Sequence, residues 1–238
     1  MKVLAIGNSF SQDATRYFHQ IAACDNTEIK VVNLYIGGCP LYAHYINALE
    51  DRKDYMLEFN GQSTGFKVSI KEALISDEWD VVTLQQVSHQ SNSYETYQPY
   101  LYYMRSYVEK YVPKAKIYIH QTWAYEQGSD RLCTEMGYTD STEMLSDIKT
   151  AYGKAAEAIG AAGIIPSGEM FGMLLESGIP KIHRDTFHAS LGLGRYALGM
   201  LWYSVLTGKD ISGNTFTNTD EPVTDEEIEI VKRVIKEL

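Results

Sequence analysis

Short apolar segments alternate with longer amphipathic segments along the whole chain. The strands expected from the apolar segments are Lys2–Ile6, Glu28–Tyr35, Asp80–Gln85, Ala115–His120 and Gly163–Pro166. These segments are apolar throughout rather than alternately apolar and polar, which is typical of strands buried on both faces of a parallel sheet. The pattern therefore predicts an α/β fold of three layers, α/β/α, in which helices cover both faces of a five-stranded parallel sheet.

The segments between the strands have helical patterns. The expected helices are one that Ser11 or Asp13 caps and that ends at about Ala23, then Leu41–Leu49, Tyr97–Tyr111, Ser141–Gly160, Phe171–Glu176, Ala189–Leu206 and a last helix that begins at Thr224 with a capping box to Glu227. The tyrosines of the 97–111 helix are expected on its core face. Asn60-Gly61 and Gly65 predict a small surface hairpin, an insertion at about residues 51–70. No linker composition interrupts the alternation, so residues 1–238 are predicted to form one domain.

Charge and cysteine usage narrow the classes of function. A formal net charge of −10 disfavours binding to nucleic acid or to an anionic membrane surface, because both are negatively charged. No apolar run approaches the ~20 residues that span a bilayer. The three cysteines are odd in number and far apart, which rules out a zinc ribbon and argues against a disulfide framework. The lack of a signal segment fits a cytoplasmic protein, and it fits equally a secreted or periplasmic protein whose leader was removed. The oligomeric state stays open.

The first candidate for chemistry follows the first strand. Gly7-Asn8-Ser9-Phe10-Ser11 leads directly into a helix, and ligands of parallel sheets bind beyond the carboxyl ends of the strands. A serine at this point lies at a helix N-terminus, where backbone N–H groups can stabilise an alkoxide or a tetrahedral oxyanion. Taken alone, Ser9 or Ser11 is better explained as a helix cap.

The second candidate lies in the loop before the penultimate helix, in Asp185-Thr186-Phe187-His188. A hydroxyl is a poor nucleophile until a base takes its proton, and histidine does this near neutral pH. A carboxylate three residues earlier can orient the other ring nitrogen and stabilise the imidazolium. Alone, the motif also fits a capping Asp and a surface His. Because both loops should open on the same sheet edge, Ser9, His188 and Asp185 are predicted to act as nucleophile, base and orienting carboxylate.

These motifs resemble those of the SGNH (GDSL-like) hydrolase superfamily, in the same order and over nearly the whole chain. The resemblance rests on Gly7-Asn8-Ser9-Phe10-Ser11, on Gly38, and on Asp185 and His188 followed by Ser190 and Gly192. It implies a flavodoxin-like fold with five parallel strands, Ser9 as nucleophile and a Gly38 N–H in the oxyanion hole. The α/β-hydrolase elbow is not matched, since Ser11 stands where that pattern needs Gly.

The third motif departs from the superfamily, which carries a Gly and an Asn after the third strand. Here the strand continues into Leu84-Gln85-Gln86-Val87-Ser88-His89, which is similar to a variant in a subgroup of SGNH-like bacterial proteins. A Gln amide can donate the hydrogen bond of the missing Asn from a longer stem. Gln85 is the first choice, with Gln86 and His89 as alternatives.

The resulting hypothesis is a serine ester hydrolase that works through an acyl-enzyme without cofactor or metal. Acetylated carbohydrates or other small esters are the expected substrates, from the resemblance and from the abundance of tyrosine. One rival is a metal-dependent hydrolase that uses His183, Asp185 and His188, with His120 as a further ligand. Another is a non-catalytic carbohydrate-binding protein with the same fold. A flavin or nucleotide protein is disfavoured, because no Gly-x-Gly-x-x-Gly or phosphate-loop lysine is present.

Overall fold

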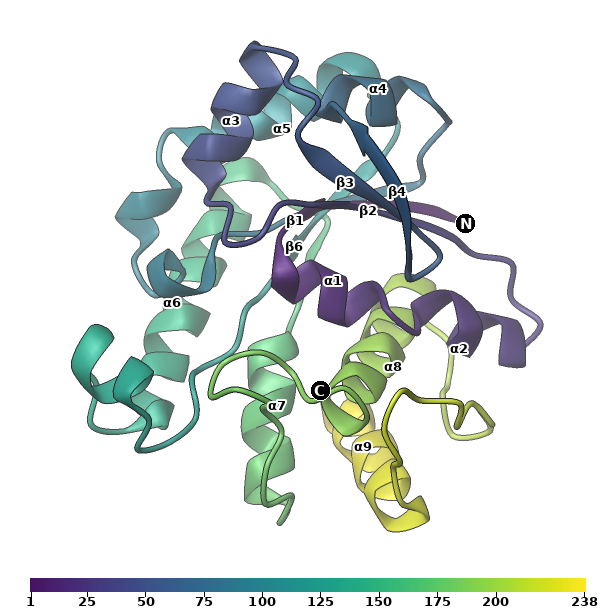
Figure 1. Cartoon of the computed structure of the whole chain (residues 1–238), viewed down its shortest axis with the longest axis vertical. Helices are drawn as coiled ribbons and strands as arrows, with labels where there is room; N and C mark the ends of the chain where they lie inside the picture. Colours follow the sequence, from purple (N-terminus) through teal and green to yellow (C-terminus); the bar gives the residue numbers. More distant parts are fainter.

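Seven strands form one sheet in the computed structural model, which describes residues 1–238 (Figure 1). The strand order is β4-β3-β2-β1-β5-β6-β7. The strands are β1 (Lys2–Gly7), β2 (Lys30–Tyr35), β3 (Tyr55–Phe59), β4 (Gln62–Val68), β5 (Val81–Leu84), β6 (Lys116–His120) and β7 (Gly163–Ile165). β2, β1, β5, β6 and β7 are parallel to one another, which is the flavodoxin-like order and confirms the predicted parallel set.

Helices cover both faces of the sheet, as predicted. In Figure 1, α3, α4 and α5 lie on one face, whereas α1, α2, α8 and α9 lie on the other. The helices are α1 (Ser9–Thr15), α2 (Phe18–Cys24), α3 (Leu41–Leu49), α4 (Ile70–Ile75), α5 (Tyr100–Tyr111), α6 (Ser141–Ile159), α7 (Ser167–Glu176), α8 (Leu193–Thr207) and α9 (Asp225–Glu237). None of them combines the length and the apolar character needed to cross a membrane.

The predicted hairpin exists, but it is part of the sheet. β3 pairs antiparallel with β2, and β4 pairs with β3, so the sheet has seven strands rather than five. The turn at Asn60-Gly61 has positive φ at both residues, and the Asn60 side chain accepts a hydrogen bond from Val31 N at 2.9 Å. The pairing satisfies the edge of β2, which would otherwise expose unpaired backbone groups.

Several expected helix starts are wrong: α5 begins at Tyr100 rather than Tyr97, α7 begins at Ser167 rather than Phe171, and two further errors lie near the candidate site. Asn8, rather than Ser11 or Asp13, caps α1, because its Oδ1 accepts a hydrogen bond from Phe10 N at 3.1 Å. α8 begins at Leu193 rather than Ala189, because Ala189 forms an antiparallel bridge with His183.

The tyrosines of α5 do not form its core face. The buried residues of α5 are Leu101, Met104 and Val108, whereas Tyr102 and Tyr103 are exposed. The Tyr103 ring stacks on Tyr45 of α3, with 5.0 Å between the ring centroids. Tyr103 and Tyr45 therefore form a contact between the two helices, whereas Tyr100, Tyr107 and Tyr111 are half-buried against the core.

Candidate active site

A cavity of about 340 Å³ lies at the carboxyl edge of the parallel strands. It is lined by the turn after β1, the loop after β2, the loop after β5 and the loop that precedes α8. Ser9, Gly38, His89 and His188 all contribute to its wall. The cavity is therefore where the sheet topology places a ligand site.

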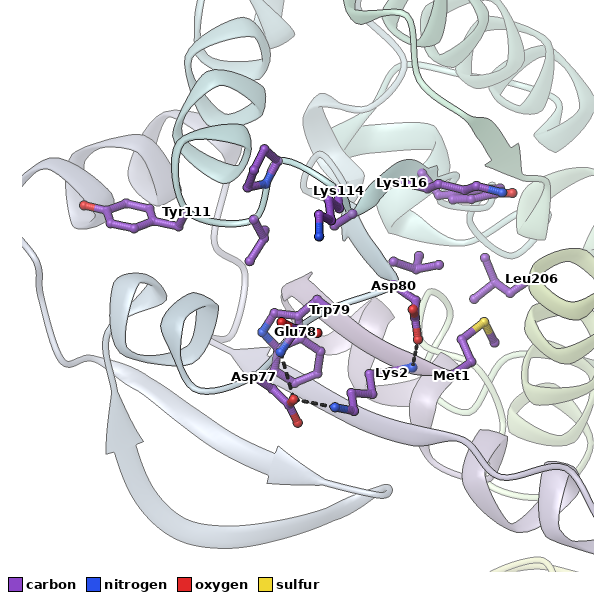
Figure 2. Close-up of a pocket in the computed structure, with 15 residues that line it drawn as sticks. Met1, Lys2, Asp77, Glu78, Trp79, Asp80, Tyr111, Lys114, Lys116 and Leu206 are labelled. Atoms are coloured by element: carbon purple, nitrogen blue, oxygen red, sulfur yellow. Dashed lines mark hydrogen bonds and ion pairs between the residues drawn. The ribbon is translucent and has the colours of Figure 1, made fainter.

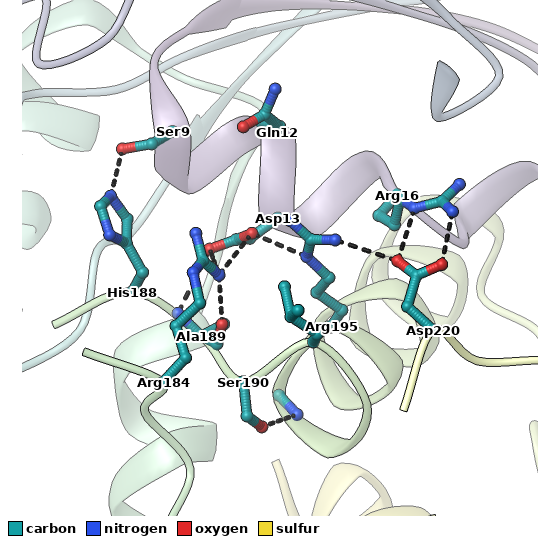
Figure 3. Close-up of polar contacts among 12 residues, drawn as sticks. Ser9, Gln12, Asp13, Arg16, Arg184, His188, Ala189, Ser190, Arg195 and Asp220 are labelled. Carbon is teal, nitrogen blue, oxygen red and sulfur yellow. Dashed lines mark hydrogen bonds and ion pairs between the residues drawn. The ribbon is translucent and has the colours of Figure 1, made fainter. Parts of the chain in front are cut away.

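Ser9 and His188 of this cavity wall form a hydrogen-bonded row with Asp185, which lies behind His188. Ser9 Oγ lies 2.8 Å from His188 Nε2 (Figure 3), and His188 Nδ1 lies 2.8 Å from Asp185 Oδ2. Asp185 Oδ1 also accepts the His188 backbone N–H at 2.9 Å. Burial raises the pKa of Asp185, but the hydrogen bonds from His188 outweigh burial and hold the pKa below its ordinary value. A charged carboxylate here favours the tautomer with the proton on Nδ1, in which Nε2 can accept a hydrogen bond from the Ser9 hydroxyl.

The loop that carries Asp185 and His188 is fixed by backbone hydrogen bonds. Glu126 N donates to Thr186 O at 2.7 Å, and Trp123 Nε1 donates to Phe187 O at 2.7 Å. Thr186 has a φ of +73°, a conformation that costs a non-glycine residue about 1–3 kcal/mol. The loop therefore keeps a strained conformation that the segment after β6 holds in place.

A buried carboxylate joins this loop to the helix of Ser9. Asp13 is fully buried and accepts hydrogen bonds from Arg184 Nη1 at 3.0 and 2.9 Å and from Ala189 N at 3.2 Å (Figure 3). Arg195 Nε of α8 donates to the same carboxylate at 2.8 Å. Arg195 Nη1 in turn donates to Asp220 at 3.1 Å. Asp13 thus fixes both ends of the Asp185–His188 segment relative to α1.

The turn before Ser9 is packed closely against the end of β5. An added Cβ at Gly7 would lie 2.5 Å from Ser11 Oγ and 2.8 Å from Gln85 Oε1, so only glycine fits there. The Asn8 side chain donates to Cys39 O at 3.1 Å, which ties the turn to the loop after β2. Gly38 in that loop has a φ of +62°, and its N–H has no acceptor within the protein.

Neither predicted glutamine reaches the cavity. Gln85 Nε2 donates to Asn8 Oδ1 at 2.7 Å, and Gln85 Oε1 accepts from His120 Nδ1 at 2.9 Å. Gln86 Oε1 accepts from Leu41 N at 2.9 Å, and Gln86 Nε2 donates to the Thr96 carbonyl at 3.0 Å. Both side chains are buried, and their amide groups are held by these bonds. Their expected role as oxyanion donors is therefore corrected to a structural one in this arrangement.

Of the predicted donors Gln85, Gln86 and His89, only His89 lines the cavity, and a pair of hydroxyl groups lines it as well. Ser88 Oγ and Tyr125 OH lie 2.9 Å apart, and both residues line the cavity. One O–H suffices for their mutual hydrogen bond, so the other proton can go to a third group. Ser88 lies within the segment considered from the sequence, but no local signal distinguishes it, and Tyr125 follows a different strand.

Of the residues of the expected metal site, only Asp185 and His188 are brought together. His183 is buried with its Nε2 3.1 Å from Ala124 O, and burial lowers its pKa to about 4. His120 is bound between Gln85 and Ser167. No group of three or more His, Cys, Asp or Glu side chains is placed to hold a metal ion.

A second, larger cavity of about 730 Å³ lies at the opposite edge of the sheet (Figure 2). Its wall includes Lys2, Asp77 and Asp80; the Lys2 ammonium pairs with Asp77, and Asp80 accepts a hydrogen bond from the Lys2 backbone. Lys2 Nζ donates to Asp77 at 2.6 Å, and Lys2 N donates to Asp80 at 2.7 Å. No histidine, serine or cysteine lines it, so the smaller cavity is the better candidate for chemistry.

Comparison with solved structures places the fold in the class of the SGNH hydrolases. A candidate SGNH hydrolase from Slackia heliotrinireducens has a TM-score of 0.63 at 20% identity, over 87% of this chain and 98% of that one. The protein named TesA has a TM-score of 0.56 at 14% identity, over 87% and 99%.

Two matches of higher similarity show the family to which this chain belongs. The model of DUF4886, a domain of unknown function, matches residues 2–236, so this chain belongs to the DUF4886 family. A DUF4886 family protein from Bacteroides uniformis ATCC 8492 has a TM-score of 0.93 at 29% identity, over 100% of this chain and 93% of that one. A search of curated proteins finds no match.

Proposed function

We propose that this protein is a serine ester hydrolase that acts through an acyl-enzyme. The observation that carries the proposal is the row of Ser9, His188 and Asp185, with 2.8 Å from Ser9 to His188 and 2.8 Å from His188 to Asp185. These distances are those of a nucleophile, a base and an orienting group in direct hydrogen-bond contact. The row faces a cavity large enough for a small ligand.

The reaction proceeds in two steps. His188 Nε2 takes the Ser9 proton as Oγ attacks the ester carbonyl carbon, and it returns that proton to the departing alcohol. Water then attacks the acyl-Ser9 ester with His188 again as base, and the acid is released as Ser9 recovers its proton. The Asp185 carboxylate stabilises the imidazolium in both steps. No cofactor and no metal enters either step.

Three donors are assigned to the oxyanion. The Ser9 N–H is at the first position of α1 and therefore has no carbonyl partner within the helix. The Gly38 N–H lacks a protein acceptor, and the hydroxyl pair of Ser88 and Tyr125 has a proton to spare. This pair replaces Gln85 and Gln86 as the third donor in the proposed mechanism.

The expected substrates are small esters. A cavity of about 340 Å³ is near the lower limit of small-molecule sites, so it favours short acyl groups such as acetyl. Acetylated carbohydrates remain within this class, because their acyl group is small and the sugar can extend out of the cavity.

Hydrolysis of p-nitrophenyl acetate by variants tests the proposal. Ser9→Ala and His188→Gln are expected to lose at least a thousandfold in kcat/KM, whereas the matched changes Ser106→Ala and His19→Gln, outside the cavity, keep the wild-type rate. Labelling by a fluorophosphonate probe should be lost in Ser9→Ala alone among the serine variants. Equal rates and equal labelling in Ser9→Ala and wild type would contradict the nucleophile and favour a non-catalytic carbohydrate-binding protein. Activity abolished by EDTA and restored by zinc would favour the metal-dependent rival.

A further inference from the structure

The two charged side chains that line the Ser9 cavity are both positive, although the protein as a whole carries a formal charge of −10. Arg131 and Arg184 line the cavity, and no Asp or Glu does. A substrate anion is repelled by the net charge at long range, so the local arginines decide whether it can bind. The two guanidinium groups differ in how strongly they are paired with carboxylates of the protein.

Arg184 is already neutralised. Its Nη1 donates to both oxygens of the buried Asp13 carboxylate, at 3.0 and 2.9 Å, and its Nε lies 4.0 Å from Asp185. A charge held between two carboxylates has little attraction left for a third anion. Arg184 therefore fixes the loop and is not the group that binds a ligand.

Arg131 has a much weaker partner. Its Nη1 lies 3.5 Å from Glu135, whose side chain is 58% exposed, and such an exposed pair contributes about 0–1 kcal/mol. The guanidinium lies over the Phe187 ring, with its Cζ 3.9 Å from the ring centroid. A stacked guanidinium keeps the N–H groups at its edge for a ligand.

The position of Arg131 relates it directly to the reacting groups. The Phe187 ring that carries Arg131 is also 3.8 Å from the His188 ring, measured between centroids. The distance from Arg131 Cζ to the centre of the His188 ring therefore cannot exceed the sum of these two distances. A ligand whose ester group contacts Ser9 and His188 has only a short distance to span before it reaches Arg131.

We infer that the cavity selects small esters that carry a carboxylate, and that Arg131 is the residue that binds this carboxylate. This inference rests on the proposed function and specifies its substrate class. A carboxylate matches the planar, two-pronged arrangement of guanidinium N–H donors, which a neutral ester of the same size cannot use. The carboxylate is in either the acyl or the alcohol part of the ester, and the test distinguishes the two.

Two matched pairs of esters test the inference. The carboxylate is in the acyl part of 4-nitrophenyl hemisuccinate, with 4-nitrophenyl butyrate as its neutral counterpart. It is in the alcohol part of 4-acetoxybenzoate, with methyl 4-acetoxybenzoate as its counterpart. Wild type is expected to prefer the anionic ester at least tenfold in kcat/KM in one pair, and Arg131→Gln should reduce that preference at least tenfold. Arg131→Lys should restore part of it, and Arg105→Gln, an exposed arginine paired with Glu109, should leave it unchanged.

The outcomes separate this inference from the proposed function. Ser9-dependent hydrolysis without a preference in either pair, or an Arg131→Gln ratio equal to that of wild type, overturns the carboxylate inference alone. Hydrolysis that does not depend on Ser9 overturns the proposed function and the inference with it. Protection of Ser9 from labelling gives an independent test of binding. Succinate should slow fluorophosphonate labelling of Ser9 more than succinamide does, and Arg131→Gln should abolish this difference. Equal protection by both compounds in wild type would contradict the inference.

Discussion

The carboxylate of Asp13 accepts hydrogen bonds from Arg184 Nη1 at 3.0 and 2.9 Å, although 171 positions separate the two residues in the chain. Asp13 is four positions after Ser9 on α1, and Arg184 immediately precedes Asp185. The pair therefore connects the helix of the proposed nucleophile to the loop of the proposed base. Its loss should change the distance from Ser9 to His188 without removing either residue.

Asp13→Asn should lower kcat more than it raises KM, with a loss of at least tenfold in kcat/KM. The amide leaves Arg184 and Arg195 without their buried countercharge, and breaking such a pair costs about 3–5 kcal/mol. Asp220→Asn is the matched control, because Asp220 binds Arg195 and Arg16 but makes no contact with the loop of His188. Thermal unfolding should show a loss of stability in both variants, and steady-state kinetics should show the large loss of kcat only in Asp13→Asn. Equal kinetic losses would mean that Asp13 acts through stability alone.

Ser88→Ala and Tyr125→Phe should each lower kcat, whereas the melting temperature changes little. Loss of one oxyanion donor costs on the order of 10² in kcat in well-studied cases. Gln85→Met should instead destabilise the fold, because Asn8 Oδ1 and His120 Nδ1 each lose a buried hydrogen bond to the Gln85 amide, at about 1–3 kcal/mol for each group. Kinetics together with urea unfolding distinguish the two effects. Wild-type kcat in both hydroxyl variants would rule out the third oxyanion donor proposed here.

Acid should destabilise the protein through its buried histidines. Burial lowers the pKa of His44 and of His120 to about 3, from an ordinary value of 6.5. Below pH 6.5 the unfolded chain therefore binds protons that the folded chain does not. The contribution of these histidines to the free energy of unfolding is fully present above pH 6.5 and is lost as the pH decreases towards 3. Urea unfolding between pH 7 and 4.5 measures this slope. His44→Gln should reduce it by up to about 1.4 kcal/mol per pH unit. An unchanged slope in His44→Gln would show that His44 does not contribute.

Gly61→Ala should be more destabilising than Gly65→Ala. Both glycines have a positive φ, +81° and +76°, so both changes carry a similar backbone cost of about 1–2 kcal/mol. An added Cβ at Gly61 would lie 2.1 Å from Arg16 O, whereas nothing lies within 4 Å of one at Gly65. The difference between the two unfolding free energies measures how tightly the hairpin packs against α1. Equal values would mean that the turn moves away from Arg16 without cost.

Much of the architecture could be predicted from the local pattern. Strands that are apolar throughout indicate burial on both faces of the sheet, and burial on both faces is typical of a parallel sheet between two layers of helices. The order of the motifs along the chain then places Ser9 and the Asp185–His188 loop at the same sheet edge, where the structure joins them by hydrogen bonds. Each of these conclusions depends on periodicity or on chain order, which a sequence contains directly.

Tertiary structure decided which partners the polar side chains take. The amides of Gln85 and Gln86 could reach an oxyanion or the protein interior, and only packing against Asn8, His120 and Leu41 settles the choice. The same holds for Asp13 and Arg184, and for the hairpin that completes the edge of β2. A hydrogen bond between residues that are far apart in the chain produces no periodic pattern in the sequence. The proposed nucleophile, base and orienting carboxylate were therefore visible beforehand, whereas the hydroxyl pair, Arg131 and the groups that position the site became visible only in the folded chain.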